Sequence, residues 1–378
     1  MAEPAARVVP QQTDVPRWRK EAEAHKRAMP LQRLLGNGMD FADAHALYAA
    51  VDSGESWADA ADAIGSRNQE RALEAEGAGR HASAIGWYRR AAACFRFGQV
   101  PLDDSDPRKP RLYERLIASY RAAGRLLNPP VERIEVEFSG HALAGWLQLP
   151  AEVVSERPRG TVVIFGGFDG WREEYDTGAQ ALNERGLATC LVDLPGQGEA
   201  RVLNGAHMPE DPDGVVTALG AFLTALTNHT QLGGRIGVWG NSLGGYLAAR
   251  AACRDPRIDA LCINGGSDRP AEVLQRYPGF IRKVELLFGV HDPARAAAYL
   301  NRMTLTPRML SELTSPLLIL HGRPDQIFLF ESAERILRAA ASADKTLLAW
   351  SDGDHCIYNH TADKHAIVAD WFVHRLTH

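Results

Sequence analysis

The pattern of hydrophobic and polar positions divides the chain into two parts. From about residue 15 to residue 128, apolar residues recur three and four positions apart, as in FADAHALYAAVDSG and KPRLYERLIASYRAAGRLL. Glycine or proline stands near the ends of these stretches, and strand-like alternation is almost missing. Such spacing is typical of amphipathic helices. We therefore predict an all-helical N-terminal domain over residues 1–128.

One stretch of this part resembles a repeat unit. The segment RALEAEGAGRHASAIGWYRRAAACF has the small-residue and aromatic spacing of a tetratricopeptide-like helical hairpin. Only one clear copy is present, whereas a repeat array needs about three copies to bury its core. We therefore expect the helices to form a cap or a dimer surface rather than a peptide-binding array.

Beyond residue 128 the pattern changes to short apolar runs. The alternating segment RIEVEFSGHALAGWLQLP predicts an antiparallel hairpin that turns at Ser139 and Gly140. The runs that follow end in glycine-bearing turns and alternate with helical stretches: TVVIFGG, ATCLVDLPG, RIGVWGNS, ALCINGG and PLLILHG. This order predicts an α/β fold with a mostly parallel sheet covered by helices on both faces. It would occupy residues 129–378, with a helical lid insertion at about 267–312.

Composition and charge indicate which classes of partner the protein is not expected to bind. The formal net charge is −5 and no basic run is present, which argues against nucleic acid or an anionic bilayer as a partner. No apolar stretch approaches the roughly 20 residues of a membrane span. The start MAEPAARVVPQQTDVPRW lacks the apolar core of a secretory signal, so we expect a cytoplasmic location. The 5 cysteines are widely spaced, which predicts reduced thiols without a disulfide or a zinc site.

The segment IGVWGNSLGGYLAAR places Ser242 in a turn between a predicted strand and a predicted helix. Glycine at 240 and 244 removes the side chains that would collide in such a turn. The turn would present the Ser242 hydroxyl to a cleft, while the Leu243 N–H at the helix N-terminus faces a developing oxyanion. We interpret this turn as a nucleophile elbow, against the alternative of a purely structural glycine turn.

A serine nucleophile needs a histidine base, and the base needs a carboxylate that fixes its tautomer. Asp325 follows the strand in PLLILHGRPDQIF, and His355 follows a later strand in LLAWSDGDHCIYNH, which is the chain order that a nucleophile elbow requires. Asp325 could instead cap the next helix, and His355 could be a surface histidine. Of the competing histidines, we expect His321 to hydrogen bond behind the site and His360 to lie in the following helix.

The loop after the TVVIFGG strand is the expected source of a second oxyanion donor. The glycines in it let the backbone turn, so that the N–H of Phe168 faces the substrate carbonyl beside that of Leu243. Gly167 takes this role if the register differs by one residue. Glu173 and Glu174 either decorate the first turn of a helix, where negative charge is favourable, or take part in the site.

Two further predictions concern phosphate binding and cofactors. The segment DLPGQGEA lacks the lysine and hydroxyl residue of a phosphate-binding loop, so we expect it to be structural. Acidic and histidine residues are not arranged at ligand spacing, so we predict no metal and no organic cofactor.

Together these motifs resemble the α/β-hydrolase superfamily. The segments GGFDGWREEYD, DLPGQGEA, GNSLGGYLAAR, HGRPDQIF and GDHCIYNH, behind a helical N-terminal half, look like one branch of it. That branch holds 2,6-dihydroxypseudooxynicotine hydrolase, the fungal polyketide-shortening hydrolases and the fermentation-respiration switch proteins. The resemblance covers nearly the whole chain. It implies cleavage of a carbon–carbon bond beside a ketone, a homodimer formed through the N-terminal helices, and an active-site role for Glu173.

The sequence thus predicts a serine hydrolase that acts on a small molecule through an acyl-enzyme. The substrate that the resemblance implies is a 1,3-diketone or a polyketide-like compound. Trp171, Phe168 and Tyr358 are available to contact an aromatic group under a roof of helices. An esterase, a thioesterase or an acyltransferase with the same triad is the first alternative. A scaffold without catalytic activity, whose helical half binds a partner, is the second.

Overall fold

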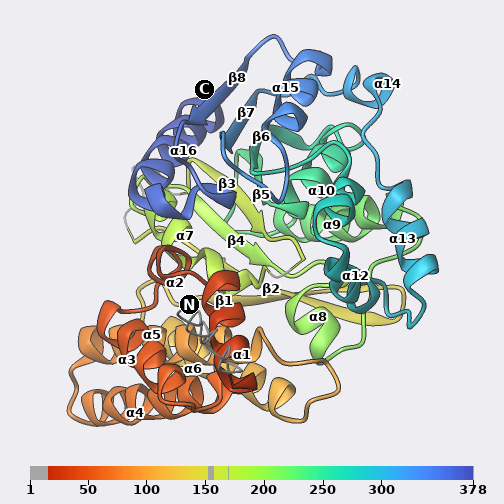
Figure 1. The fold of residues 1–378 in the computed structure, drawn as a ribbon. Coiled ribbons are helices and arrows are strands. Elements are labelled where there is room, and N and C mark those ends of the chain that lie inside the picture. The colour runs from red at the N-terminus through yellow and green to blue at the C-terminus, as the bar shows by residue number, and fades with distance from the viewer. Residues whose placement is uncertain (1–15, 152–156, 169, 378) are drawn as a thin grey trace, which may run out of the picture.

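The computed structural model describes residues 16–151, 157–168 and 170–377. The described part of the chain before β1 holds helices and no strand (Figure 1). These helices are α1 (Arg17–Ala28), α2 (Leu31–Gly36), α3 (Phe41–Asp52), α4 (Trp57–Gly77), α5 (His81–Gln99) and α6 (Arg108–Arg125). None of the helices in the described ranges combines the length and the apolarity of a membrane span.

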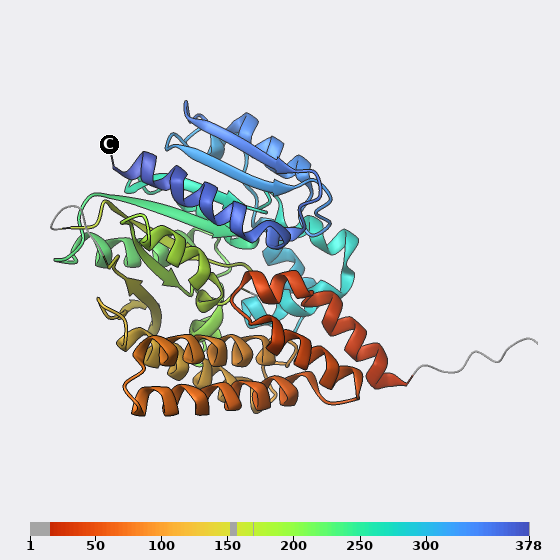
Figure 2. The same ribbon diagram turned by 90° about the vertical axis from the view of Figure 1, so that its left-hand side faces the viewer.

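Helices α4 and α5 form the helical hairpin that the repeat-like segment predicts. They lie side by side in a layer on one side of the molecule (Figure 2). Gly79, in the turn between them, has a φ of 70°, a backbone conformation that glycine adopts without strain. Gly65 of α4 faces Phe95 of α5 so closely that a Cβ at position 65 would lie 2.5 Å from the ring. The absence of a side chain at Gly65 therefore allows the two helices to approach.

The remaining chain builds an eight-stranded sheet with the order β1-β2-β4-β3-β5-β6-β7-β8. The strands are β1 (Glu132–Phe138), β2 (His141–Gln148), β3 (Gly160–Phe165), β4 (Ala188–Val192), β5 (Arg235–Asn241), β6 (Ile258–Asn264), β7 (Leu317–Gly322) and β8 (Lys345–Trp350). β1 and β2 form the predicted antiparallel hairpin, with positive φ at Ser139 and Gly140. β2 is also antiparallel to β4, and all later pairs are parallel. The predicted mostly parallel sheet is therefore confirmed.

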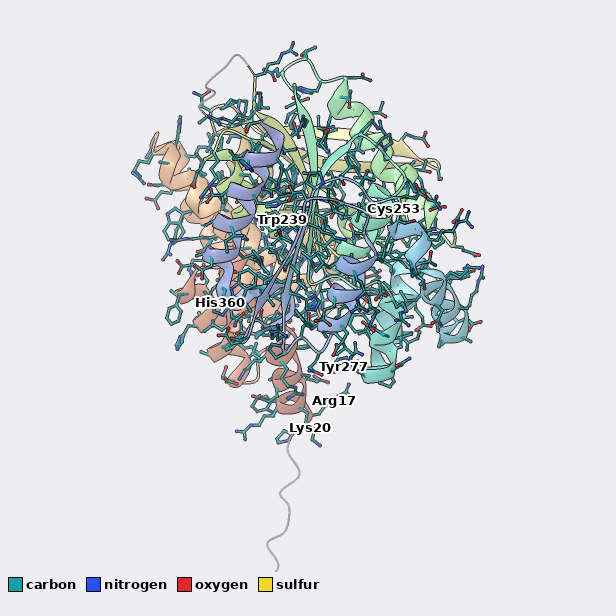
Figure 3. All side chains as sticks on the ribbon, turned by 90° about the horizontal axis from the view of Figure 1, so that it is seen from above. Arg17, Lys20, Trp239, Cys253, Tyr277 and His360 are labelled. Carbon is teal, nitrogen blue, oxygen red and sulfur yellow. The ribbon has the colours of Figure 1, made fainter. Side chains whose placement is uncertain are left out.

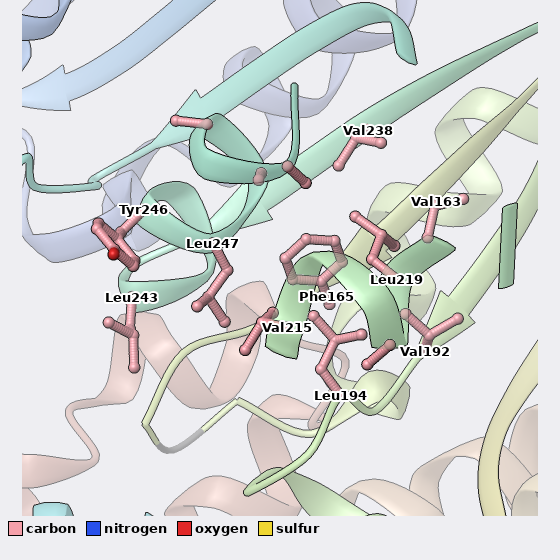
Figure 4. Packing of buried hydrophobic residues seen from close by; sticks show 14 of the residues in the cluster. Val163, Phe165, Val192, Leu194, Val215, Leu219, Val238, Leu243, Tyr246 and Leu247 are labelled. Atoms are coloured by element: carbon pink, nitrogen blue, oxygen red, sulfur yellow. The ribbon is translucent and has the colours of Figure 1, made fainter. Parts of the chain in front are cut away.

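Helices cover both faces of this sheet. Alternate residues of β3 point to different hydrophobic clusters, with Val163 and Phe165 in one and Val162 and Ile164 in the other. The first cluster, part of which Figure 4 shows, contains residues of α9 (Asp213–Thr227), α10 (Leu243–Ala252) and α15 (Phe330–Ala339). The second contains residues of α7 (Asp176–Asn183) and α16 (Thr361–Leu376). Trp239 of β5 belongs to the second cluster and lies inside the molecule, whereas His360 and Tyr277 lie toward its edge (Figure 3).

The helical part and the sheet share this second cluster. Tyr113 and Leu116 of α6 pack in it with Trp146 of β2 and with Trp171, and the rings of Tyr113 and Trp171 are 5.6 Å apart. The Tyr113 hydroxyl also donates a hydrogen bond to Asp193, just beyond β4, at 3.0 Å. The N-terminal helices are therefore seated on the sheet by both apolar and polar contacts.

Short helices separate β6 from β7, in the range where the sequence predicts an insertion. They are η2 (Pro270–Glu272), α11 (Val273–Arg276), η3 (Pro278–Phe280), α12 (Ile281–Phe288), α13 (Pro293–Arg302) and α14 (Pro307–Leu310). Another short helix, α8 (Gly198–Val202), follows β4. The segment from η3 to α12 matters for the site, because Phe280 and Lys283 in it line the cavity beside Ser242.

Candidate active site

Ser242 stands in the sharp turn between β5 and α10. Its φ of 58° and ψ of −127° are a strained backbone conformation for a residue with a side chain. A Cβ on Gly240 would collide with the carbonyl oxygen of Gly244, and a Cβ on Gly244 would collide with that of Gly166. The glycines are therefore required by the close approach of the backbone on both sides of the serine.

Three side chains that are far apart in sequence meet at this turn. His355 Nε2 lies 2.9 Å from the Ser242 hydroxyl oxygen, and His355 Nδ1 lies 2.8 Å from Asp325 Oδ2. The second carboxylate oxygen of Asp325 accepts backbone hydrogen bonds from Ile327 at 2.8 Å and from Phe328 at 3.2 Å. The Asp325 side chain is fully buried, whereas 23% of the His355 side chain is exposed. The Asp325 carboxylate is thus held in place by its hydrogen bonds, and part of the His355 imidazole remains accessible.

The protonated form of His355 and the ionised form of Asp325 stabilise each other. Burial opposes the imidazolium form of His355, but the Asp325 carboxylate raises the pKa of His355 well above its ordinary value. Burial also opposes ionisation of Asp325, while the neighbouring His355 lowers the pKa of the carboxyl group. Asp325 is therefore an anion at neutral pH that stabilises a protonated His355, as a serine nucleophile would require of its base.

The predicted oxyanion donors lie around Ser242 as well. The Leu243 N–H is the first amide of α10, and a first-turn amide has no carbonyl partner within its own helix. Gly167 lies directly beside it, since a Cβ there would be 2.7 Å from the Leu243 nitrogen. Phe168 follows in the same loop, and its ring packs edge-on against Phe280 at 4.9 Å. Of the two alternatives for the second donor, Gly167 therefore lies beside Ser242, and Phe168 lines the same cavity as Ser242.

A cavity of about 340 Å³ opens over Ser242 and His355. Its volume is in the range of small-molecule sites. Aromatic side chains line much of it: Phe168, Tyr175, Tyr277, Phe280 and Tyr358. The cations on its wall come from α1, α2 and α12: Arg27, Arg33 and Lys283. The N-terminal helices and the segment between β6 and β7 therefore enclose the same space, although they are far apart in sequence.

Two residues expected near the substrate point elsewhere. Trp171 and Glu173 are not among the described residues that line the cavity. Trp171 is 2% exposed and packs against Tyr113 in the second cluster. Glu173 Oε1 accepts hydrogen bonds from Trp146 at 2.7 Å and from Arg172 at 2.9 Å. The short helix η1 (Arg172–Tyr175) directs Glu173 toward the sheet and Tyr175 toward the cavity.

Glu174, the neighbour of Glu173, contacts a residue of the cavity wall. Its carboxylate accepts hydrogen bonds from Arg33 at 3.2 Å and from Asn37 at 3.1 Å. Arg33 lines the cavity, and both donors belong to the N-terminal helical part. Glu174 therefore ties the loop after β3 to the roof of the cavity.

Arg172 holds this loop to the sheet through a buried ion cluster. Its guanidinium contacts the carboxylates of Glu173 at 2.9 Å, Asp193 at 3.3 Å and Glu199. Its backbone N–H donates to Asp193 at 3.0 Å. Burial raises the pKa of Asp193 to about 6, although Arg172 opposes the shift. The loop that carries the predicted oxyanion donor is therefore fixed by charges that are almost wholly buried.

Substitution of Arg172 by methionine is expected to destabilise the protein by about 3–5 kcal/mol, because three buried carboxylates lose their common cation. Urea denaturation followed by circular dichroism measures this loss. Arg80→Met is the matched control, since Arg80 pairs with Glu74 at the surface at 3.4 Å. Equal denaturation midpoints for the two variants would show that the cluster does not stabilise the fold.

The structure also shows the positions of the two competing histidines and of the cysteines. His321 Nε2 bonds to the carbonyl oxygen of Phe328 at 2.8 Å and lies 3.5 Å from Asp325 Oδ2, behind the carboxylate. His360 instead pairs with Asp352 at 3.0 Å near the surface. Within the described ranges no group of three or more histidine, cysteine or acidic side chains is arranged to hold a metal ion. All of the cysteines are buried and none forms a disulfide.

Two residues that the sequence analysis did not single out support the turn and the loop. Gln197, in the DLPGQGEA segment, donates to the carbonyl oxygens of Gly166 at 2.6 Å and Gly167 at 3.3 Å. Asn264 accepts a hydrogen bond from the Ser242 N–H at 2.8 Å, and its side chain donates to the carbonyl of Cys356 at 3.0 Å. Asn264 thereby joins the serine turn to the loop that carries the histidine.

Comparison with known proteins shows similarity along nearly the whole chain. The profile of the family described as serine aminopeptidase, S33, matches residues 156–284. The chain is 27% identical over 348 residues to 2,6-dihydropseudooxynicotine hydrolase of Paenarthrobacter nicotinovorans, covering 90% of this chain and 89% of that protein. An alignment of that length includes the N-terminal helices as well as the sheet.

The chain is also similar to a solved structure and to a fungal protein. The crystal structure of 2,6-dihydroxy-pseudo-oxynicotine hydrolase superposes with a TM-score of 0.81 and 26% identity, covering 91% of this chain and 95% of that one. The alpha/beta hydrolase ucsC from an Acremonium species is 31% identical over 260 residues, which span 62% of this chain and 52% of that protein. The resemblance read from the sequence motifs is therefore confirmed.

Proposed function

This chain has the α/β-hydrolase fold and resembles the 2,6-dihydroxypseudooxynicotine hydrolase branch of that superfamily, and from this premise we propose that it is a serine hydrolase. One observation carries the proposal. Hydrogen-bonding distances of 2.9 and 2.8 Å link the Ser242 hydroxyl through His355 to Asp325, at the floor of the cavity. In this reading Ser242 is the nucleophile, His355 the general base and Asp325 the group that orients the base.

The proposed reaction has two steps. His355 removes the Ser242 proton while the oxygen attacks a substrate carbonyl, and the N–H groups of Leu243 and Phe168 stabilise the oxyanion. The bond to the leaving group then breaks, and the protonated His355 returns the proton to that group. Water activated by His355 hydrolyses the acyl-enzyme by the same route. Apart from the substrate and this water, the scheme uses side chains and backbone amides of the chain.

We favour a carbon–carbon bond beside a ketone as the bond that is cleaved. Expulsion of a carbanion requires a second carbonyl group that accepts its electrons, so a 1,3-diketone is a suitable substrate. The resemblance to the branch supports this choice, and the aromatic cavity wall supports an aromatic or polyketide-like small molecule. An esterase, thioesterase or acyltransferase would use the same triad and the same acyl-enzyme.

Reaction of the wild-type protein with a fluorophosphonate probe and a substrate panel tests this proposal. We expect covalent labelling at Ser242 and faster hydrolysis of 1-phenyl-1,3-butanedione, relative to its spontaneous rate, than of p-nitrophenyl butyrate or butyryl thioesters. Labelling with ester or thioester turnover only would favour the alternative hydrolases. A folded protein that neither reacts with the probe nor turns over any member of the panel would favour a scaffold without catalytic activity.

A further inference from the structure

Three tyrosines line the cavity, and none takes part in the proposed triad or oxyanion site; Tyr277 is 40% exposed, whereas Tyr175 is buried and Tyr358 is half-buried. Tyr175 ends the short helix η1, and its hydroxyl lies against the oxyanion loop, since a Cβ on Gly170 would be 2.5 Å from it. Tyr358 lies in η4 (His355–His360), three residues after the predicted base. Both side chains line the cavity together with Ser242. Neither hydroxyl forms a hydrogen bond with any residue in the described part of the chain.

Tyrosines elsewhere in the fold behave differently. The hydroxyl of Tyr113 donates to Asp193 at 3.0 Å, that of Tyr120 donates to Asp176 at 2.7 Å, and that of Tyr88 donates to Glu76 at 2.8 Å. Buried phenols are normally paired in this way, because an unpaired hydroxyl that has lost water costs free energy. The unpaired hydroxyl groups of two residues that line the cavity are therefore available to a bound molecule.

The surroundings keep both groups protonated and in place. Burial, reinforced by the nearby Glu174 carboxylate, raises the pKa of Tyr175 and of Tyr358 well above the ordinary value. The Tyr358 ring lies 5.8 Å from the Arg33 guanidinium and 5.1 Å from Lys364 Nζ. Its backbone N–H donates to Asp354 at 2.5 Å. At neutral pH both phenols are therefore hydrogen-bond donors held by their neighbours.

We propose that Tyr175 and Tyr358 are catalytic residues that donate hydrogen bonds to the second carbonyl oxygen of a 1,3-dicarbonyl substrate. The first carbonyl is the one that Ser242 attacks, and its oxygen takes the oxyanion position. When the carbon–carbon bond breaks, its electron pair moves into the leaving group and becomes an enolate on the second oxygen. The two phenols stabilise that negative charge until His355 delivers its proton to the enolate carbon. This inference rests on the proposed function.

The chemistry predicts which substrates need the two tyrosines. Charge on a 1,3-diketone leaving group accumulates on an oxygen two bonds from the bond that breaks, where a separate pair of donors can meet it. A p-nitrophenyl ester expels an oxygen that is itself the leaving atom and that is already a stable anion. The tyrosines should therefore contribute more to diketone cleavage than to ester cleavage.

Single substitutions to phenylalanine remove only the hydroxyl groups. Tyr175→Phe and Tyr358→Phe should each lower kcat/KM for 1-phenyl-1,3-butanedione about 10- to 100-fold more than kcat/KM for p-nitrophenyl butyrate, as expected for a hydrogen bond to a charged oxygen. Tyr299→Phe is the matched control, because the Tyr299 hydroxyl contacts Glu210 outside the cavity. Equal losses on both substrates would overturn the assignment, and so would the absence of any loss.

A binding measurement separates this inference from the proposed reaction. In the Ser242→Ala background, the enolate absorbance of bound 1-phenyl-1,3-butanedione should appear at a lower pH than in free solution. Adding Tyr175→Phe or Tyr358→Phe should move that ionisation back toward its solution pH, and an ionisation that does not move would overturn the inference. Failure of the proposed function appears differently, as wild-type protein that leaves the diketone uncleaved.

Discussion

Substitution of Ser242 by alanine is expected to lower kcat about 10⁶-fold, because the proposed acyl-enzyme forms on the hydroxyl that this change removes. The Ser242 oxygen lies 2.9 Å from His355 Nε2, which places this hydroxyl within hydrogen-bonding reach of the proposed base. Turnover of whichever substrate the wild-type protein cleaves fastest measures the loss. Covalent labelling by a fluorophosphonate should disappear in the same variant.

A control must show that the fold survives this substitution. Ser311→Ala removes a hydroxyl that bonds to the carbonyl of Arg308 at 2.8 Å, and it should retain full turnover and labelling. Circular dichroism should give the same spectrum for both variants, since alanine removes only an oxygen at either position. Retained labelling in a folded Ser242→Ala protein would assign the nucleophile to a different residue.

Substitution of Asp325 by asparagine is expected to lower kcat about 10⁴-fold and to move the pH profile. The base works only when it is neutral, so wild-type kcat/KM should fall as the pH drops through the raised pKa of His355. The carboxylate is what raises that pKa, because it stabilises the protonated ring. Without it the pKa falls, and the acidic limb of the profile should shift to lower pH even as the rate drops.

The chain contains a second aspartate–histidine pair that serves as a control. Asp352 and His360 lie 3.0 Å apart near the surface, and Asp352 is 70% exposed. Asp352→Asn should leave both the rate and the acidic limb unchanged. If Asp325→Asn kept the acidic limb of the wild type, His355 would not be the group whose ionisation governs the reaction.

The sheet and the order of its functional segments could be predicted because both depend on local pattern. The central residues of two strands, VVIF in β3 and LLIL in β7, contain no polar residue, which is the pattern of a strand buried on both faces. Since parallel strands end at one edge, residues that follow them are brought together. The meeting of Ser242, Asp325 and His355 follows from that rule, and their catalytic roles remain a proposal.

The direction of the side chains after β3 could not be predicted in the same way. In the short helix η1, adjacent residues point to opposite surroundings, and which one faces the cavity depends on partners elsewhere in the chain. Arg172 is drawn inward by Asp193 and Glu199, and Glu173 is drawn with it toward Trp146. The resemblance suggested an active-site role for Glu173, whereas the structure leaves Tyr175 facing the cavity.

The contacts that place the N-terminal helices over the cavity could not be predicted from the sequence for a related reason. Arg33 and Glu174 meet at 3.2 Å although 141 positions separate them, and no short motif marks either residue. The periodicity of the N-terminal part predicts helices, but it carries no information about which helix lies over the sheet. Contacts between distant segments depend on the packing of both partners, which a single sequence does not display.

The residues proposed for catalysis and the residues that form the upper cavity wall lie on different segments, and this separation affects how such a protein can evolve. The strand ends and their turns carry the atoms that would make and break bonds, whereas α1, α2 and the segment from η3 to α12 supply the walls above them. Mutations in those walls can alter which molecules are accepted while the reaction machinery is inherited intact. Paralogues with new substrate ranges can therefore arise through substitutions in these wall segments alone.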